Sequence, residues 1–140
     1  MRALEIRRHA QREKDEDRLS DAGRDLAARV ASTTTRSFDR VFVSPAARAS
    51  ETAELLAPGL TPTVIKGLGS DDEPARLADV LGELFGELPD HSRALVVGHT
   101  PLIEKSVAGL TGREIAPLSE CEGVLIVEEG GEYRMEELRL

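Results

Sequence analysis

The chain has 140 residues, a length typical of one domain, and we expect residues 1–140 to form a single domain. Its formal net charge of -8 argues against general binding to nucleic acid or to an anionic membrane surface. Apolar runs fall short of the roughly 18 residues of a membrane span, no secretory signal pattern is present, and the single cysteine, Cys121, excludes an internal disulfide. The sequence therefore predicts a cytoplasmic location.

Short apolar runs and helical patterns alternate along the first half of the chain. Their spacing predicts strands over residues 3–8, 40–43 and 63–65, and helices over residues 20–35 and 46–57. Ser20 is expected to cap the first helix. The apolar side chains expected to share its buried face are Ala22, Leu26, Ala27 and Val30.

The second half of the chain continues the alternation of strands and helices and ends in two adjacent strands. Pro74 suits the first turn of a helix whose apolar side chains are Leu77, Val80, Leu81, Leu84 and Phe85. We expect a buried strand over 93–97, a helix from Thr100-Pro101 to Gly112, and a hairpin of residues 123–128 and 132–138 around Gly130-Gly131. The pattern predicts an α/β fold of three layers, with a mainly parallel central sheet flanked by helices and a C-terminal β-hairpin.

Three of the predicted strands end in side chains suited to phosphate chemistry. Arg8 and His9 end the first strand, Arg48 follows the second, and His99 follows the strand at 93–97. Ligands of open α/β sheets bind beyond the carboxyl ends of the strands, so these four residues are expected to form one pocket. A neutral imidazole is a competent nucleophile towards phosphorus, and an arginine holds a phosphate through two parallel hydrogen bonds. The pattern therefore points to handling of a phosphoryl group.

A metal site is the competing interpretation of His9 and His99. The flanking arginines would repel a cation, and the sequence has no histidine pair at i, i+4, so we predict neither a metal nor a cofactor. The basic residues near the first strand end offer an anion a positive field, but interleaved acidic residues favour a solvated loop for most of them. These basic residues are Arg7, Arg8, Arg12, Lys14 and Arg18.

Segments 6–10, 44–53 and 97–99 resemble the motifs of the histidine phosphatase superfamily, whose fold is phosphoglycerate mutase-like. The resemblance extends over about residues 4–112, and the short length is similar to the small SixA-like branch of phosphohistidine phosphatases. It implies that His9 is the nucleophile that becomes phosphorylated. It also implies that Arg8, Arg48 and His99 form the phosphate pocket, and that Arg18 reaches the substrate phosphate from the loop.

The sequence departs from the family pattern at two places. Ala10 stands where the family usually has glycine; a positive φ there would cost alanine about 1 kcal/mol, and otherwise the methyl group only narrows the pocket. Many members also supply a carboxylate as general acid, for which the candidates here are Asp71, Asp72 and Glu73. Acidic residues also favour helix starts, so these three are equally interpreted as charges that stabilise the helix beginning near Pro74.

The resemblance implies a metal-independent phosphatase that works through a phosphohistidine intermediate. Its partner would be a phosphorylated protein or a small phosphorylated molecule, with either a phosphohistidine or a phosphate ester as substrate. No large insertion caps the pocket, which favours hydrolysis over a mutase reaction because a mutase must retain its intermediate. The alternative is a non-catalytic phosphate-binding module of the same fold.

Overall fold

The computed structural model describes residues 1–33, 37–69 and 74–140 of the chain. Its strands are β1 (Arg2–Arg8), β2 (Arg40–Val43), β3 (Thr63–Val64), β4 (Arg93–Gly98), β5 (Gly123–Glu129) and β6 (Glu132–Leu138). Its helices are α1 (Asp21–Thr33), α2 (Ala47–Leu56), α3 (Pro74–Glu87) and α4 (Leu102–Thr111), with a short 3-10 turn, η1 (Lys66–Leu68), before α3. The predicted strands and helices are all present, and the 3-10 turn is the addition.

The six strands form one sheet in the order β3-β2-β4-β1-β5-β6. Strands β3, β2, β4 and β1 run parallel to one another. Strand β5 runs antiparallel to β1, and β6 runs antiparallel to β5. The turn between β5 and β6 contains Gly130 and Gly131 with φ of 61° and 84°, a left-handed conformation that favours glycine. The predicted α/β class, with a mainly parallel sheet and a C-terminal hairpin, is confirmed.

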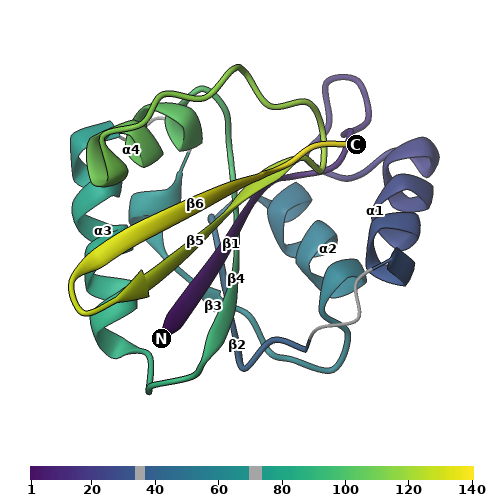
Figure 1. Cartoon of the computed structure of the whole chain (residues 1–140). Coiled ribbons are helices and arrows are strands. Elements are labelled where there is room, and N and C mark those ends of the chain that lie inside the picture. Colours follow the sequence, from purple (N-terminus) through teal and green to yellow (C-terminus); the bar gives the residue numbers. More distant parts are fainter. Residues whose placement is uncertain (34–36, 70–73) are drawn as a thin grey trace.

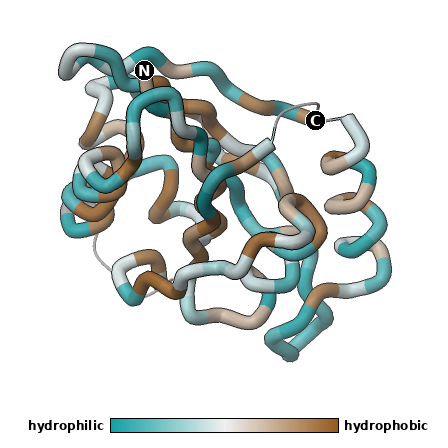
Figure 2. The backbone as a smooth tube through the Cα atoms, turned by 90° about the horizontal axis from the view of Figure 1, so that it is seen from below, coloured by the Kyte–Doolittle hydropathy of each residue, from teal (hydrophilic) through white to brown (hydrophobic). Residues whose placement is uncertain are grey.

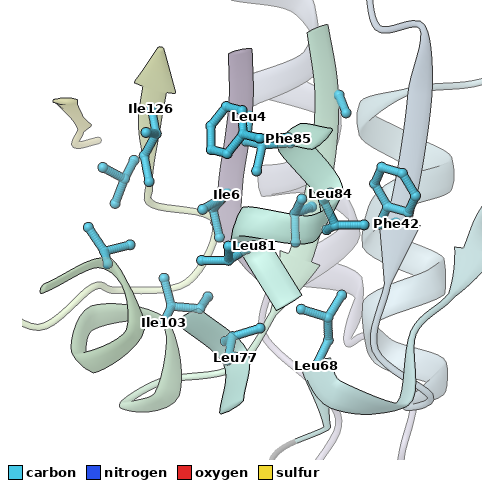
Figure 3. Packing of buried hydrophobic residues seen from close by; sticks show 14 of the residues in the cluster. Leu4, Ile6, Phe42, Leu68, Leu77, Leu81, Leu84, Phe85, Ile103 and Ile126 are labelled. Atoms are coloured by element: carbon cyan, nitrogen blue, oxygen red, sulfur yellow. The ribbon is translucent and has the colours of Figure 1, made fainter. Parts of the chain in front are cut away.

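Helices cover both faces of this sheet, α3 and α4 on one side and α1 and α2 on the other (Figure 1). Under α3 and α4, side chains such as Leu4, Ile6 and Phe42 are at most 1% exposed and pack together (Figure 3). The helices carry alternating hydrophilic and hydrophobic stretches along their length (Figure 2). Each large apolar side chain buried in this way stabilises the fold by roughly 1.5–3 kcal/mol.

The strand register brings three carboxyl ends to the same edge of the sheet. Arg8 at the end of β1 pairs with Gly98 at the end of β4, and Val43 at the end of β2 pairs with Val97. The next residues along the chain therefore leave the sheet side by side. This alignment is what assembles a site from three distant segments.

Helix α1 begins after Ser20 as predicted, but its buried face differs from the prediction at Ala22. Ser20 Oγ accepts a hydrogen bond from the Gly23 N–H (3.0 Å), as expected of a capping residue. Ala22, however, is exposed, and Gly23 is the buried residue. A Cβ on Gly23 would lie 2.2 Å from the Gln11 carbonyl oxygen, so this turn packs against the backbone of the preceding loop and admits no side chain. The predicted end of the helix near residue 35 lies outside the described residues.

The connection between α4 and β5, residues 112–122, contains neither helix nor strand. It starts at Gly112, whose φ of 75° ends α4 as predicted, and returns across the top of the sheet (Figure 1). This return brings Leu118 and Glu120 to the carboxyl ends of the strands. Among the described residues, every helix is too short or too polar to cross a membrane.

Candidate active site

A cavity of about 270 Å³ opens at the carboxyl ends of β1 and β4. The four residues expected from the strand ends, Arg8, His9, Arg48 and His99, all line it, and the two imidazole rings meet edge to face with centroids 5.2 Å apart. The other lining residues are Gln11, Arg12, Thr100 and Glu120. The structure thus brings together side chains that are up to 91 positions apart in the sequence, from Arg8 to His99.

The His9 ring is held in one orientation by the backbone. Its Nδ1 lies 2.7 Å from the carbonyl oxygen of Ala10, and since a carbonyl can only accept, Nδ1 carries the proton. In the neutral ring the lone pair is then on Nε2, which faces Nε of Arg48 at 3.3 Å. Burial lowers the pKa of His9, the Ala10 hydrogen bond opposes this, and the Arg48 and Arg8 guanidiniums lower it further. His9 is therefore a neutral imidazole at neutral pH, and its Nε2 lone pair accepts a hydrogen bond from Nε of Arg48.

His99 is buried deeper, with only 4% of its surface exposed. Nη2 of Arg48 lies 3.5 Å from Nδ1 of His99, and a guanidinium nitrogen can only donate. The neutral His99 ring therefore carries its proton on Nε2, which lies 2.7 Å from Ser44 Oγ. Ser44 Oγ also accepts the Ala46 N–H at 3.2 Å, which fixes the hydroxyl. Burial, followed by the charges of His9 and Arg48, lowers the pKa of His99 to about 4.

Arg8 and Arg48 present their guanidiniums from two sides of the cavity. Nη1 of Arg8 donates to the Leu118 carbonyl at 2.9 Å, which ties the end of β1 to the connection before β5. Arg12 adds a third guanidinium, and Glu120 is the one carboxylate among the lining residues. Three arginines and one glutamate line the cavity, and Arg48 is also paired with the Asp17 carboxylate. The remaining excess of positive charge suits an anion site in a chain that is acidic overall.

The donor set does not favour a cation. Within the described residues, no three histidine, cysteine, aspartate or glutamate side chains come together as metal ligands would. His9 and His99 are the two imidazoles of the cavity, and each is within reach of the Arg48 guanidinium. A divalent cation bound there would have to approach that positive charge.

The structure places Arg18 away from the cavity. Its Nε donates to Glu16 at 2.6 Å, its side chain is 60% exposed, and it is not among the lining residues. Arg12 of the same loop lines the cavity instead. Asp71, Asp72 and Glu73, the candidates for a general acid, lie outside the described residues.

Ala10 fits the site without strain. It is not among the described residues with a positive φ, so its conformation does not need glycine. Its N–H donates to Thr52 Oγ1 at 3.0 Å, and its methyl group is fully buried in the cluster beneath α1 and α2. Ala10 also does not line the cavity, so it neither strains the backbone nor narrows the pocket.

Comparison with known proteins identifies the arrangement. Residues 4–69 match the sequence profile described as histidine phosphatase superfamily (branch 1), a segment that includes His9 and Arg48. The resemblance to the histidine phosphatase superfamily is confirmed. No curated protein sequence matches the chain significantly.

Solved structures share this fold over almost the whole chain. A phosphoserine phosphatase from Entamoeba histolytica, in complex with 3-phosphoglyceric acid, superposes with a TM-score of 0.84 at 18% identity, covering 100% of this chain and 98% of that one. The protein histidine phosphatase SixA complexed with tungstate gives 0.78 at 22%, covering 98% and 96%. A phosphoglycerate mutase from Bacillus anthracis gives 0.82 at 16%, covering 96% and 91%. The fold is therefore phosphoglycerate mutase-like.

Asp17 is a residue of this candidate site that the sequence did not indicate. Helix α2 has no side-chain cap of its own, and Asp17 supplies one from the loop after β1: it accepts the N–H groups of Ala47 (2.9 Å) and Arg48 (3.1 Å). Its Oδ1 also accepts Nη1 of Arg48 at 3.0 Å. Burial alone would raise the pKa of Asp17, but these hydrogen bonds together lower it. Asp17 therefore holds both the helix start and the arginine side chain.

We expect Asp17→Asn to weaken substrate binding and stability together. The amide keeps one acceptor oxygen but loses the charge, so the free energy of unfolding should fall by about 1 kcal/mol and KM for a phosphate ester should rise several-fold as Arg48 loses its partner. Denaturant melts and steady-state kinetics measure both. Asp15→Asn is the matched control, because Asp15 is exposed in the same loop and asparagine tolerates its φ of 59°. Equal KM values in the two variants would contradict the positioning role.

Proposed function

We propose that this chain is a metal-independent phosphatase that forms a phosphohistidine intermediate on His9. The observation that carries the proposal is the state of the His9 ring. Its Nδ1–H is fixed on the Ala10 carbonyl, and its Nε2 lone pair accepts a hydrogen bond from Arg48 Nε, one of the arginines that line the cavity. The family assignment supports a phosphatase, and structurally similar proteins are phosphatases acting on different substrates.

The first step transfers the phosphoryl group to His9. The Arg8, Arg12 and Arg48 guanidiniums neutralise the nonbridging oxygens, and the Nε2 lone pair forms a bond to phosphorus. The bond from phosphorus to the leaving oxygen or nitrogen breaks, and the leaving group takes its electron pair and a proton from solvent or, for an alkoxide, from a general acid. The hydrogen bond from Nδ1 to the Ala10 carbonyl stabilises the positive charge that the ring acquires.

The second step returns His9 to its resting state. A water oxygen attacks phosphorus on the side opposite Nε2, the phosphorus–nitrogen bond breaks, and the electron pair returns to Nε2. The water loses a proton to solvent, and inorganic phosphate leaves. His99 acts in both steps by its position: the negative charge of a bound phosphate favours protonation of its Nδ1, which then donates to a nonbridging oxygen.

The leaving group decides whether a general acid is needed. An imidazole can be protonated before it leaves, whereas an alkoxide gains typically 10²–10⁴-fold from a positioned acid. Asp71, Asp72 and Glu73 stay candidates for that acid. The proposed substrates are accordingly a phosphohistidine on a protein and a small phosphomonoester.

A non-catalytic phosphate-binding module is the alternative, and its main support was the alanine at position 10. The negative φ and buried methyl group of Ala10 remove the expected strain, so the nucleophile keeps its orientation without glycine. The geometry therefore favours turnover.

Assays with an aryl phosphate and with a phosphohistidine peptide test the proposal. Both should be hydrolysed, because neither leaving group depends strongly on an acid. Vanadate and inorganic phosphate should inhibit competitively, and a chelator should leave the rates unchanged. Phosphate binding without turnover would establish the binding module, and a loss on chelation that added metal restores would establish a metal site at His9 and His99.

A further inference from the structure

Glu120 is the charged lining residue that the phosphatase mechanism leaves without a role. A carboxylate beside a phosphate site repels the phosphate, so a purely anion-binding cavity would be better without it. Its negative charge acts on the cavity, since it opposes the lowering of the pKa of His9. The question is which part of a substrate would meet this charge.

Exposure divides the cavity into a floor and a rim. His99 is 4% exposed, the Arg48 side chain 19% and the Arg8 side chain 27%, whereas the Glu120 side chain is 39% exposed. A phosphate held by the two arginines and attacked by His9 occupies the floor. The leaving group then points outward, where Glu120 stands.

The backbone around Glu120 is fixed from both sides. The Leu118 N–H donates to Glu104 (3.2 Å), the Ser119 N–H donates to Glu122 (2.8 Å), and the Cys121 N–H donates to the His9 carbonyl (3.4 Å). These bonds hold residues 118–121 against the end of β1. Glu120 is therefore a preorganised group and not a side chain on a loose loop.

The carboxylate is nevertheless free to bind. Its one ion pair among the described residues is with Arg8, and the separation of 4.0 Å exceeds hydrogen-bond distance. No hydrogen bond within the described part of the chain occupies its oxygens. Arg8 donates to the Leu118 carbonyl instead.

We propose that Glu120 makes the pocket selective for phosphorylated substrates whose leaving group carries a cationic nitrogen. This inference rests on the proposed phosphatase function and specifies its substrate class. An ammonium or imidazolium group at the rim donates a charge-assisted hydrogen bond to the carboxylate. A carboxylate on the leaving group is repelled by it, so Glu120 favours one class of substrate and disfavours the other.

Three substrates of nearly equal size isolate this effect: 2-aminoethyl phosphate, ethyl phosphate and carboxymethyl phosphate. In Glu120→Gln the ratio of kcat/KM for the amino substrate over the carboxy substrate should fall roughly 3- to 10-fold, the size expected for an exposed charge pair. Glu120→Lys should reverse the preference. Ethyl phosphate should change less than about twofold. A phosphohistidine peptide distinguishes the source of the cation: a parallel loss shows that an imidazolium serves, and no loss limits the class to alkyl ammonium groups.

Glu114→Gln is the matched control, because Glu114 is exposed on the same connection and does not line the cavity. Binding of the same three compounds to His9→Ala with and without Glu120→Gln, measured by calorimetry, gives the same comparison without turnover. A failure of catalysis would therefore not hide the result.

Three outcomes would overturn the inference. An unchanged ratio in Glu120→Gln and Glu120→Lys would show that the carboxylate does not meet the leaving group. Equal losses on all three substrates would show that Glu120 acts through Arg8 or His9. Losses on all alkyl substrates with normal aryl turnover would assign it as a general acid instead, which also contradicts a selective role.

Discussion

His9→Ala is expected to abolish phosphate release, by a factor on the order of 10⁴ or more, because the variant lacks the imidazole to which the proposal assigns the nucleophilic attack. Brief exposure of the parent protein to substrate, followed by quenching without acid, should trap phosphate on His9. Phosphopeptide mapping detects it there. The His9→Ala variant should carry no phosphate after the same treatment.

The matched control for this variant is His91→Asn. His91 is exposed, lies at the opposite end of β4 from His99, and has a φ of 65° that asparagine tolerates. The control should keep full activity, and both variants should melt within a few degrees of the parent. Normal turnover by His9→Ala would remove the proposed mechanism.

The second large effect is a loss of stability in mild acid that originates at His99. Burial lowers the pKa of His99 from 6.5 to about 4 in the folded protein. Between these two values the unfolded chain binds the proton and the folded chain does not, so the free energy of unfolding falls as the pH falls. At about 1.36 kcal/mol per pKa unit, the loss between pH 6.5 and 4 is roughly 3 kcal/mol.

Urea unfolding between pH 4 and 7.5 measures this slope. His99→Gln should flatten most of it, since glutamine keeps a donor and an acceptor but does not titrate. The pKa of His9 is also lowered, so the free energy of unfolding of His99→Gln should still fall with falling pH, with a smaller slope. His91→Asn should leave the slope unchanged. Identical slopes in the parent and His99→Gln would place the acid sensitivity elsewhere.

Much of the fold could be predicted because its signals are local. Strand β4 is a continuous apolar run, and α3 carries leucines at helical spacing; both patterns report burial directly. The predicted burial of Ala22 was wrong because the buried position at the start of α1 is Gly23, which packs its backbone against Gln11. A pattern of apolar side chains cannot reveal a contact that forms only because glycine has no side chain.

The catalytic candidates were predictable for a different reason. His9, Arg48 and His99 each follow a strand, and parallel strands direct their ends to one edge, so topology alone brings them together. The sequence did not show which of Arg12 and Arg18 would line the cavity. Both are arginines of one polar loop, and the turn of that loop decides that Arg12 lines the cavity while Arg18 pairs with Glu16.

The sequence by itself determined the α/β order of elements and the residues at the strand ends, because strand and helix periodicity and short motifs are properties of neighbouring residues. Tertiary structure alone decided where Asp17 and Glu120 stand. Asp17 reaches Arg48 across 31 positions, and Glu120 stands 111 positions after His9. Neither residue belongs to a motif. A hydrogen bond or an electrostatic interaction between distant segments depends on the path of the backbone between them, so it leaves no pattern in the sequence around either residue.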